Sequence, residues 1–256
     1  MQDIADKSSQ NPSGQKKKSR PIVKIGLWII KRIERILIRY SQIPDTPFID
    51  TSEFAWIKQL EDNWEAINKE LASVLTQPER LPNFQDISKD QSNISKDDKW
   101  KTFFLYGYGF KMPENCERCP ETAKLVESIP NMMTAFFSIL APGKHIPPHR
   151  GPYKGLIRCH LALKVPEPKE NCWIKVGDET SHWEEGKCIV FDDTYVHQVQ
   201  NNTEGQRVVL FLDIVRPVRF PGSWLNRFII QLIRWSPYIQ DARKNQKAWE
   251  YRMGDN

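Results

Sequence analysis

The stretch CIVFDDTYVHQVQ, residues 188–200, contains two short runs of β-forming residues separated by the polar sequence Asp192-Asp193-Thr194. Runs of this kind, bounded by Asp, Asn, Gly or Pro, are typical of strands joined by tight turns. The same pattern predicts further strands at 102–108, 135–140, 157–164, 172–176 and 208–215. One helix, at 119–128, is expected among them. Several short strands without alternating helices indicate a sandwich or jelly roll, so the expected fold is mainly β.

Two histidines stand out because each lies in a stretch that favours β-structure. His149 belongs to HIPPHRGP, residues 145–152, and His197 begins a predicted strand. Arg207 follows ten residues after His197, and an arginine can hold a carboxylate through two parallel hydrogen bonds. Two imidazoles on separate strands, together with such an arginine, are typical of a mononuclear non-heme iron oxygenase with a keto-acid cosubstrate.

The motifs around these residues have a characteristic order and spacing. They are FSILAPG (137–143), HRGP (149–152), RCHLAL (158–163), WEEG (183–186), FDDTYVH (191–197), Arg207 and LDI (212–214). In this order, over about residues 134–217, the chain resembles the aspartyl/asparaginyl β-hydroxylase family of iron(II)- and 2-oxoglutarate-dependent dioxygenases. Outside this core, TPFI (46–49), DNW (62–64) and Arg216-Pro217 are similar to the branch of bacterial lipid A hydroxylases.

The resemblance implies a fold and a metal site. The fold would be a double-stranded β-helix, a cupin-like jelly roll, with flanking N- and C-terminal helices. His149 and His197 would bind Fe(II), where 2-oxoglutarate and O₂ react. The implied reaction is hydroxylation of an unactivated C–H bond, with release of succinate and CO₂.

The resemblance also implies how 2-oxoglutarate is held. Arg207 would bind its distal carboxylate, with the hydroxyl of Ser138 beside it. Arg158 and His160 would reach the carboxylate next to the iron. Alternation puts residues 158 and 160 on one face of a strand, as this role requires. An arginine that faces a barrel interior also needs an anion.

The usual third iron ligand, a carboxylate two residues after the first histidine, is absent because Gly151 stands there. The protein-hydroxylating branch of the family also has glycine at this place, so hydroxylation remains the expectation. Halogenation is the alternative, because related enzymes without that carboxylate bind halide. Asp192 and Asp193 are candidate replacement ligands, although their place at a strand end favours hydrogen bonding to backbone or support of the ligands.

Along the whole chain we expect four regions. Residues 1–20 form a disordered basic arm, 21–45 an amphipathic helix, 46–217 the catalytic domain, and 218–256 an amphipathic helical extension. Within these regions, helices are predicted at 52–75 and 221–239. A long surface loop that could border the substrate entrance is predicted at 78–100.

Charge is concentrated near the N-terminus. The whole chain carries +5, but residues 16–40 carry nine Lys/Arg against one acid, Glu34, which leaves the remainder acidic. The helix at 21–45 therefore either docks on the core or lies on an anionic membrane, and the basic residues favour the membrane. No segment is apolar enough to span a bilayer. Because the basicity is local, no nucleic-acid partner is expected.

Five cysteines and a polar N-terminus without a signal-peptide core indicate a reducing, cytoplasmic setting. Together with the basic helix, they predict a protein bound peripherally to the inner face of the cytoplasmic membrane. Cys116 and Cys119 form a lone CxxC pair, which we interpret as structural rather than metal-binding or redox-active. His145 and His182 lack the context of the other histidines, so we interpret them as ordinary surface residues.

Three substrates or roles remain open. The basic helix and the C-terminal amphipathic segment favour hydroxylation of a membrane lipid's acyl chain, on a lipid A-like molecule or an aminolipid. Gly151 and the core motifs are equally typical of a hydroxylase of Asp or Asn in a protein or peptide. A cupin-like module that only binds ligand is the third possibility. It is disfavoured because all the expected iron and cosubstrate residues are present together.

Overall fold

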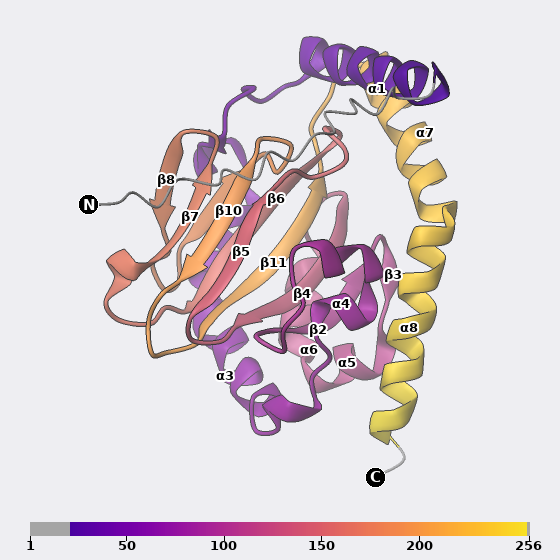
Figure 1. The fold of residues 1–256 in the computed structure, drawn as a ribbon. Helices are drawn as coiled ribbons and strands as arrows, with labels where there is room; N and C mark the ends of the chain where they lie inside the picture. Colours follow the sequence, from indigo (N-terminus) through magenta and orange to yellow (C-terminus); the bar gives the residue numbers. More distant parts are fainter. Residues whose placement is uncertain (1–20, 255–256) are drawn as a thin grey trace, which may run out of the picture.

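The computed structural model describes residues 21–254, so the basic arm expected at 1–20 lies outside the described residues. Two antiparallel sheets face each other (Figure 1). The larger has the strand order β1-β9-β6-β11-β4-β2-β3 and the smaller β5-β10-β7-β8. The strands are β1 (Phe48–Ile49), β2 (Trp100–Gly107), β3 (Phe110–Lys111), β4 (Met132–Leu140), β5 (Lys144–His149), β6 (Leu156–Lys164), β7 (Cys172–Val176), β8 (Glu179–His182), β9 (Cys188–Phe191), β10 (His197–Asn201) and β11 (Arg207–Val215).

The connections make this a jelly roll. From β4 to β11 the chain alternates between the two sheets, apart from the hairpin β7–β8, and this gives the two four-stranded halves of a double-stranded β-helix. The expected fold is therefore confirmed. Every strand predicted from residue patterns is present, and its ends differ by at most three residues.

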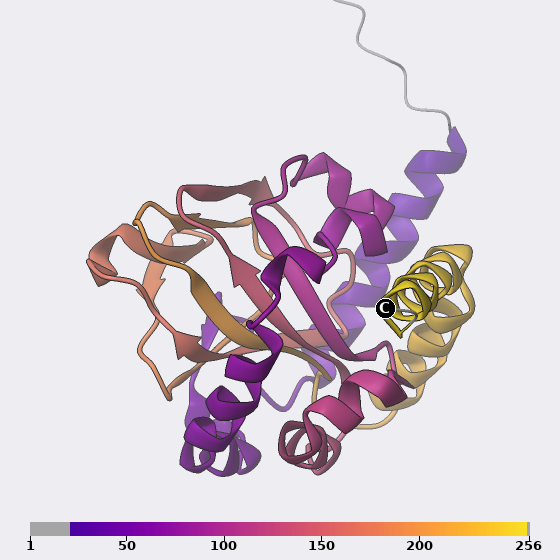
Figure 2. The same cartoon turned by 90° about the horizontal axis from the view of Figure 1, so that it is seen from below.

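Helices cover the outside of the larger sheet and one end of the barrel (Figures 1 and 2). They are α1 (Pro21–Tyr40), α2 (Trp56–Asp62), α3 (Trp64–Val74), α4 (Phe84–Ile87), α5 (Pro113–Arg118), α6 (Pro120–Glu127), α7 (Gly222–Trp235) and α8 (Pro237–Gly254). Apolar residues of α2, α3 and α6 form one core with the outward-facing side chains of β2, β4, β6 and β11. The inward-facing side chains form a second core between the sheets.

Three expected segments differ from the structure. The helix expected at 52–75 is divided at Asn63, whose backbone is not helical. The helix expected at 221–239 is interrupted at Ser236, because the residue before a proline disfavours the helical conformation, and α8 then starts at Pro237. The segment 78–100 is not a plain loop. It contains two 3-10 turns, η2 (Pro78–Arg80) and η3 (Lys89–Asn93), and the capped helix α4.

Helices α1 and α7 pack against each other beside the barrel and bury only part of their apolar side chains. Leu37 of α1 and Ile230 of α7 join a third cluster with Tyr153 and Leu156. Other apolar residues of these helices stay exposed, so the apolar stripe of α1 both docks on the core and faces outward. Among the described residues, no helix is long and apolar enough to cross a membrane.

Candidate active site

His149 and His197 are brought together by strand pairing. His149 ends β5 and His197 begins β10, and the two are direct partners in the antiparallel register. Their ring centroids lie 4.1 Å apart. Nδ1 of His149 lies 2.9 Å from the carbonyl oxygen of Pro147, and Nδ1 of His197 lies 3.0 Å from that of Tyr195. A carbonyl only accepts, so each Nδ1 carries the proton and each Nε2 keeps a free lone pair.

Burial also keeps both histidines neutral. Desolvation lowers the pKa of His149, and it lowers the pKa of His197 to about 3, with the neighbouring His149 adding to the effect. Neutral imidazoles with free Nε2 atoms are the form that binds a divalent transition metal. The pair therefore fits two ligands of an iron site.

The described residues contain no group of three His, Cys, Asp or Glu side chains that could hold a metal. At Gly151, a Cβ atom would overlap the carboxylate of Asp193. The backbone N–H of Gly151 also donates to the Asp193 carbonyl oxygen over 2.7 Å. Asp193 therefore fills the space where the carboxylate ligand of related sites is attached, and glycine is required at 151.

The two adjacent aspartates have different surroundings. Asp193 forms an ion pair with Arg158 at 3.0 Å, and burial raises its pKa to about 6. Asp192 points into a buried network, where it accepts from Arg216 and lies 2.8 Å from Lys154 Nζ. It also accepts from the backbone N–H of Thr194 at 3.0 Å. These contacts give Asp192 a supporting role under the turn that precedes His197.

Arg207 is buried, and the part of the chain that the structure describes gives it no counter-ion. Its side chain is 1% exposed, and Nε and Nη1 have no hydrogen-bond partner. Its guanidinium lies 4.6 Å from the ring centroid of Trp183, and no carboxylate among the described residues forms an ion pair with it. Burial lowers its pKa to about 10. A buried cation of this kind calls for an anion, as the carboxylate-binding role requires.

Further unpaired polar groups lie in the same interior. Both ring nitrogens of the buried His160 lack a hydrogen-bond partner, and burial lowers its pKa well below the usual value. Ser138 Oγ accepts from Trp100 Nε1 at 3.1 Å. Thr102, the direct strand partner of Ser138, has an unpaired hydroxyl, and Trp183 has an unpaired indole N–H.

Thr102 and Trp183 were not expected in the site from the sequence. Trp183 could have been found as the first residue of the WEEG motif, and Thr102 from the alternation of inward-facing and outward-facing residues along β2. A hydroxyl or an indole N–H is too common in sequences to stand out before its burial is known.

Arg158 differs from its expected environment. It lies on the same face of β6 as His160, as alternation predicted. However, its Nε donates to Asp213 at 3.0 Å and its Nη2 pairs with Asp193, so the protein supplies its anions. These carboxylates outweigh desolvation and raise the pKa of Arg158. The expected contact between Arg158 and a cosubstrate carboxylate stays a prediction.

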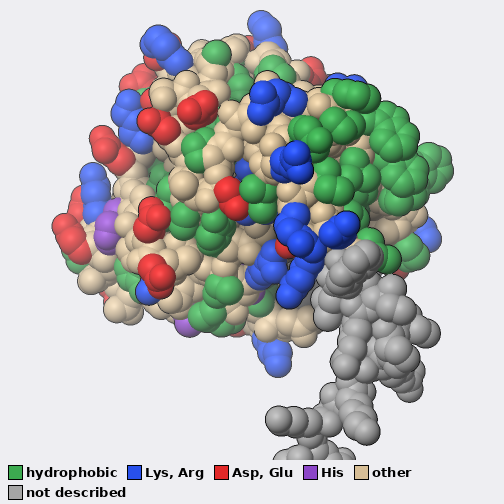
Figure 3. Space-filling model, turned by 90° about the horizontal axis from the view of Figure 1, so that it is seen from above, with side chains coloured by type: hydrophobic (Ala, Val, Ile, Leu, Met, Phe, Trp, Pro, Cys, Tyr) green, Lys and Arg blue, Asp and Glu red, His purple; other side chains and the backbone are tan. Residues whose placement is uncertain are grey.

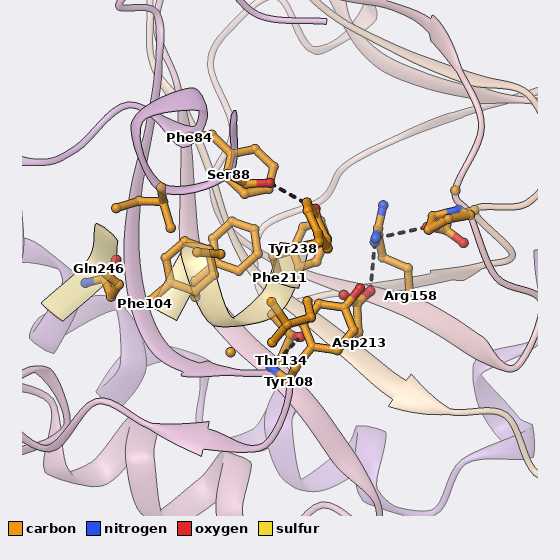
Figure 4. Close-up of a pocket in the computed structure, with 18 of the residues that line it drawn as sticks. Phe84, Ser88, Phe104, Tyr108, Thr134, Arg158, Phe211, Asp213, Tyr238 and Gln246 are labelled. Carbon is orange, nitrogen blue, oxygen red and sulfur yellow. Dashed lines mark hydrogen bonds and ion pairs between the residues drawn. The ribbon is translucent and has the colours of Figure 1, made fainter. Parts of the chain in front are cut away.

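A cavity of about 170 Å³ opens beside His149. Figure 4 shows residues that line it. His149, Arg158 and Asp193 line one part of it, together with Asp213. The other residues expected in the site do not line this cavity. They are Ser138, His160, His197 and Arg207. His149 thus borders an open cavity, whereas Ser138, His160, His197 and Arg207 are buried outside its lining.

The remaining candidates play no part in this site. Cys116 and Cys119 are buried free thiols, and burial raises the pKa of both. A thiol held neutral by burial is a poor nucleophile and metal ligand. His145 and His182 are exposed, as expected.

The site thus pairs two neutral histidines on neighbouring strands of one sheet of the jelly roll. Residues 61–217 match the family described as Aspartyl/Asparaginyl beta-hydroxylase, and the chain belongs to this family of hydroxylases. An ornithine lipid ester-linked acyl 2-hydroxylase of Rhizobium tropici is 43% identical over 225 residues, 88% of this chain and 80% of that protein.

A second relative is the aspartyl/asparaginyl beta-hydroxylase of Homo sapiens. It is 32% identical over 170 residues, which are 64% of this chain but only 22% of that longer protein. Among solved structures, a Pseudomonas putida prolyl-4-hydroxylase covers 62% of this chain and 98% of its own, with 12% identity and a TM-score of 0.40. The jelly-roll assignment rests on the two sheets themselves.

Proposed function

We propose that this protein is an Fe(II)- and 2-oxoglutarate-dependent hydroxylase that oxidises a C–H bond in the acyl chain of a membrane lipid. The observation that carries the reaction class is Arg207, a buried cation for which the described residues supply no counter-ion. Its charge acts on the buried His160, which also interacts with His197. Such a charge is unfavourable unless an anionic ligand completes the site. A dicarboxylate cosubstrate supplies that anion.

In this proposal each residue has a separate task. His149 and His197 hold the metal through Nε2, and their Nδ1–H bonds to backbone carbonyls fix the ring orientations. Arg207 and the Ser138 hydroxyl would bind the distal carboxylate, and Arg158 and His160 would reach the carboxylate next to the metal. Bound iron supplies the oxidising chemistry, while the protein positions the reactants and excludes water.

Asp193 argues against the halogenase alternative. Its carboxylate lies where the Cβ atom of a ligand at residue 151 would be, and it lines the same cavity as His149. A carboxylate repels an anion at short range, so this environment favours water over halide. Hydroxylation is the reaction that fits.

Two observations support a lipid as the substrate. First, the similarity to the ornithine lipid hydroxylase extends over 225 residues, compared with 170 for the human aspartyl/asparaginyl hydroxylase. Second, α1 and α7 present exposed apolar side chains on one side of the molecule, which we call the α1/α7 patch. Its members are Ile29, Ile30, Ile36, Trp224, Phe228, Leu232 and Trp235.

The surroundings of the α1/α7 patch suit an anionic membrane. Lys31, Arg32, Arg35 and Arg39 of α1 are exposed. Figure 3 shows hydrophobic side chains gathered on this side of the molecule, with Lys and Arg side chains next to them. Aromatic residues insert at the membrane interface. Each basic residue near an anionic membrane surface adds about 1 kcal/mol of binding free energy. We propose that this side binds the inner face of the cytoplasmic membrane.

The patch also lies near the catalytic histidines. Arg150, the residue after His149, forms an ion pair of 2.6 Å with Glu34 of α1. Tyr153 donates to Asn226 of α7 over 2.7 Å. The loop that leaves His149 is therefore held by the two helices proposed to contact the membrane, and this contact supports a substrate taken from that membrane.

Mass spectrometry of lipid extracts tests the proposal directly. Cells that express the wild-type protein should contain a lipid with one added oxygen, and cells that express His197→Ala should not, because the metal loses a ligand. Immunoblotting establishes equal expression. If no lipid changes with iron available, the proposed substrate is wrong, and hydroxylation of Asp or Asn in a protein or peptide becomes the function to test.

A further inference from the structure

The cavity beside His149 changes in character along its length. Polar side chains gather at the end near the histidine, where Arg158 is bonded to Asp213 and Asp193. Farther away the lining is aromatic and aliphatic, and it ends against α8. Figure 4 shows this order, with Arg158 at one side, Phe211 and Phe104 in the middle, and Gln246 at the other side.

Stacked aromatic rings form the floor of the apolar part. The ring centroids of Phe104 and Phe136 lie 4.4 Å apart, and those of Phe136 and Phe211 lie 4.2 Å apart. Phe84 of α4 continues the row, 5.6 Å from Phe136. These rings come from β2, β4, β11 and α4, and their contacts form one row that starts at Phe211, whose ring centroid lies 4.3 Å from the Arg158 guanidinium.

Helices α4 and α8 close the cavity from outside. Ser88 Oγ and the Tyr238 hydroxyl lie 2.9 Å apart, and Asn245 Nδ2 donates to the Ile87 carbonyl over 3.1 Å. Trp249 Nε1 donates to the Arg80 carbonyl over 3.1 Å. Because the family match ends at residue 217, α8 is an addition to the shared catalytic core.

The chemistry of this lining selects against a peptide. Ser88 and Tyr238 bond to each other, and Arg243 lies 4.2 Å from the ring centroid of Phe110. Arg243 and Gln246 are polar side chains at the α8 end of the lining, but the phenylalanine row between them and Arg158 has no hydrogen-bonding groups for backbone amides. Burying an unpaired amide costs roughly 2–7 kcal/mol. A hydrocarbon chain needs no such partners.

We propose that this cavity binds the hydrocarbon tail of the acyl substrate. The carbon to be hydroxylated lies at the His149 end, and the rest of the tail runs along the phenylalanine row to α8. This assignment rests on the proposed lipid function and identifies the site for the tail. Ile239 and Ala242 of α8 line the cavity and limit the length of the chain that fits.

A binding measurement tests the site without turnover. The probe is cis-parinaric acid, a fluorescent fatty acid, added to the wild type and to two variants with the same substitution on α8. Ala242→Trp fills the cavity, whereas Ala248→Trp lies on the exposed side of α8. We expect Ala242→Trp to weaken binding by at least about tenfold, equivalent to 1.4 kcal/mol, and Ala248→Trp to leave it unchanged.

Equal affinity of Ala242→Trp and wild type would overturn the site, as would an equal loss in Ala248→Trp. Ala242→Leu provides the same comparison with a smaller side chain if the tryptophan variant fails to fold, and thermal unfolding of each variant establishes that it has folded.

Chain-length preference separates this site from the proposed function. Ile239→Ala enlarges the cavity, so its preferred lipid substrate should carry a longer acyl chain than that of the wild type. If the wild type hydroxylates lipid but Ile239→Ala keeps the same chain-length profile, the tail site is wrong while the proposed function stands. If the wild type hydroxylates no lipid, the proposed function fails, whatever the probe shows.

Discussion

At the scale of single residues, Arg207 and Arg158 differ in whether the protein itself supplies a carboxylate partner. Both are arginines on neighbouring strands that point between the sheets. Arg158 is neutralised by Asp193 and Asp213, whereas Arg207 has no carboxylate partner among the described residues. The depressed pKa of Arg207 means that the folded state disfavours its charge. A buried guanidinium without a carboxylate partner therefore destabilises the ligand-free fold at neutral pH.

We therefore expect Arg207→Met to raise the stability of the ligand-free protein, by about 1–4 kcal/mol. The same variant should need much more 2-oxoglutarate for turnover. Arg158→Met is the matched control, and it should lose stability because two carboxylates stay behind unpaired. Thermal unfolding with and without 2-oxoglutarate and metal measures both effects. A less stable Arg207→Met in the absence of ligand would contradict the interpretation of Arg207 as an anion site.

Gly151 gives a second prediction at this scale. Gly151→Asp introduces the carboxylate that related iron sites have, but its Cβ would overlap Asp193. We expect weaker Fe(II) binding and lower stability, not an improved site. Removing the obstacle in the double variant Gly151→Asp/Asp193→Gly should recover Fe(II) affinity relative to the single variant. Anaerobic metal titration distinguishes the two. Tight binding by Gly151→Asp alone would show that Asp193 does not block this position.

At the scale of elements, α1 and α7 each have two apolar sides with different partners. One side packs on the loop after His149, and the other forms the α1/α7 patch. Trp224 and Phe228 are stacked on α7 with centroids 6.0 Å apart and are more than half exposed. Water-exposed aromatic pairs next to a basic helix are typical of a membrane-binding surface.

Replacing Trp224 and Phe228 together by Glu should abolish flotation with anionic vesicles, because it removes apolar contact and adds repulsive charge. Stability should change little, since both side chains are exposed. Val196→Glu is the control, because Val196 is also exposed but lies outside the α1/α7 patch, on the β9–β10 connection. If the Trp224/Phe228 variant floats like the wild type, the membrane-binding surface lies elsewhere.

At the scale of the whole molecule, a buried ion network joins segments far apart in the chain. Asp192 contacts Arg216, at the end of β11, and Lys154, in the loop after β5. Lys154 in turn pairs with Asp45 in the connector after α1. The network therefore ties the turn before His197 to the connector after α1 and to the residue that follows β11.

Arg216→Met should cost roughly 3–5 kcal/mol of stability, because Asp192 would remain buried with less compensation. Urea unfolding measures the loss. Asp50→Asn, at an exposed helix cap of the same connector region, should cost much less and serves as the control. A loss for Arg216→Met no larger than that of the control would show that the network does not hold these segments together.

The sequence alone determined the strands, the jelly roll and the positions of the key residues along them. Alternation placed Arg158 and His160 on one face, and the motif order indicated His149, His197 and Arg207. These features are local or periodic, so residue order records them. The helix breaks at Asn63 and Ser236 were not predicted from the sequence, because the apolar stripes continue across them and only the backbone conformation marks each break.

Only the tertiary structure decided which charges have partners and which surfaces are covered. Three findings depend on contacts between distant segments. Asp193 fills the space beside Gly151, Arg207 has no counter-ion among the described residues, and α8 closes an apolar cavity. A residue type specifies what a side chain can bind, whereas burial and partners decide what it needs. The burial of a side chain and its partners follow from the packing of the two sheets and their helices in three dimensions.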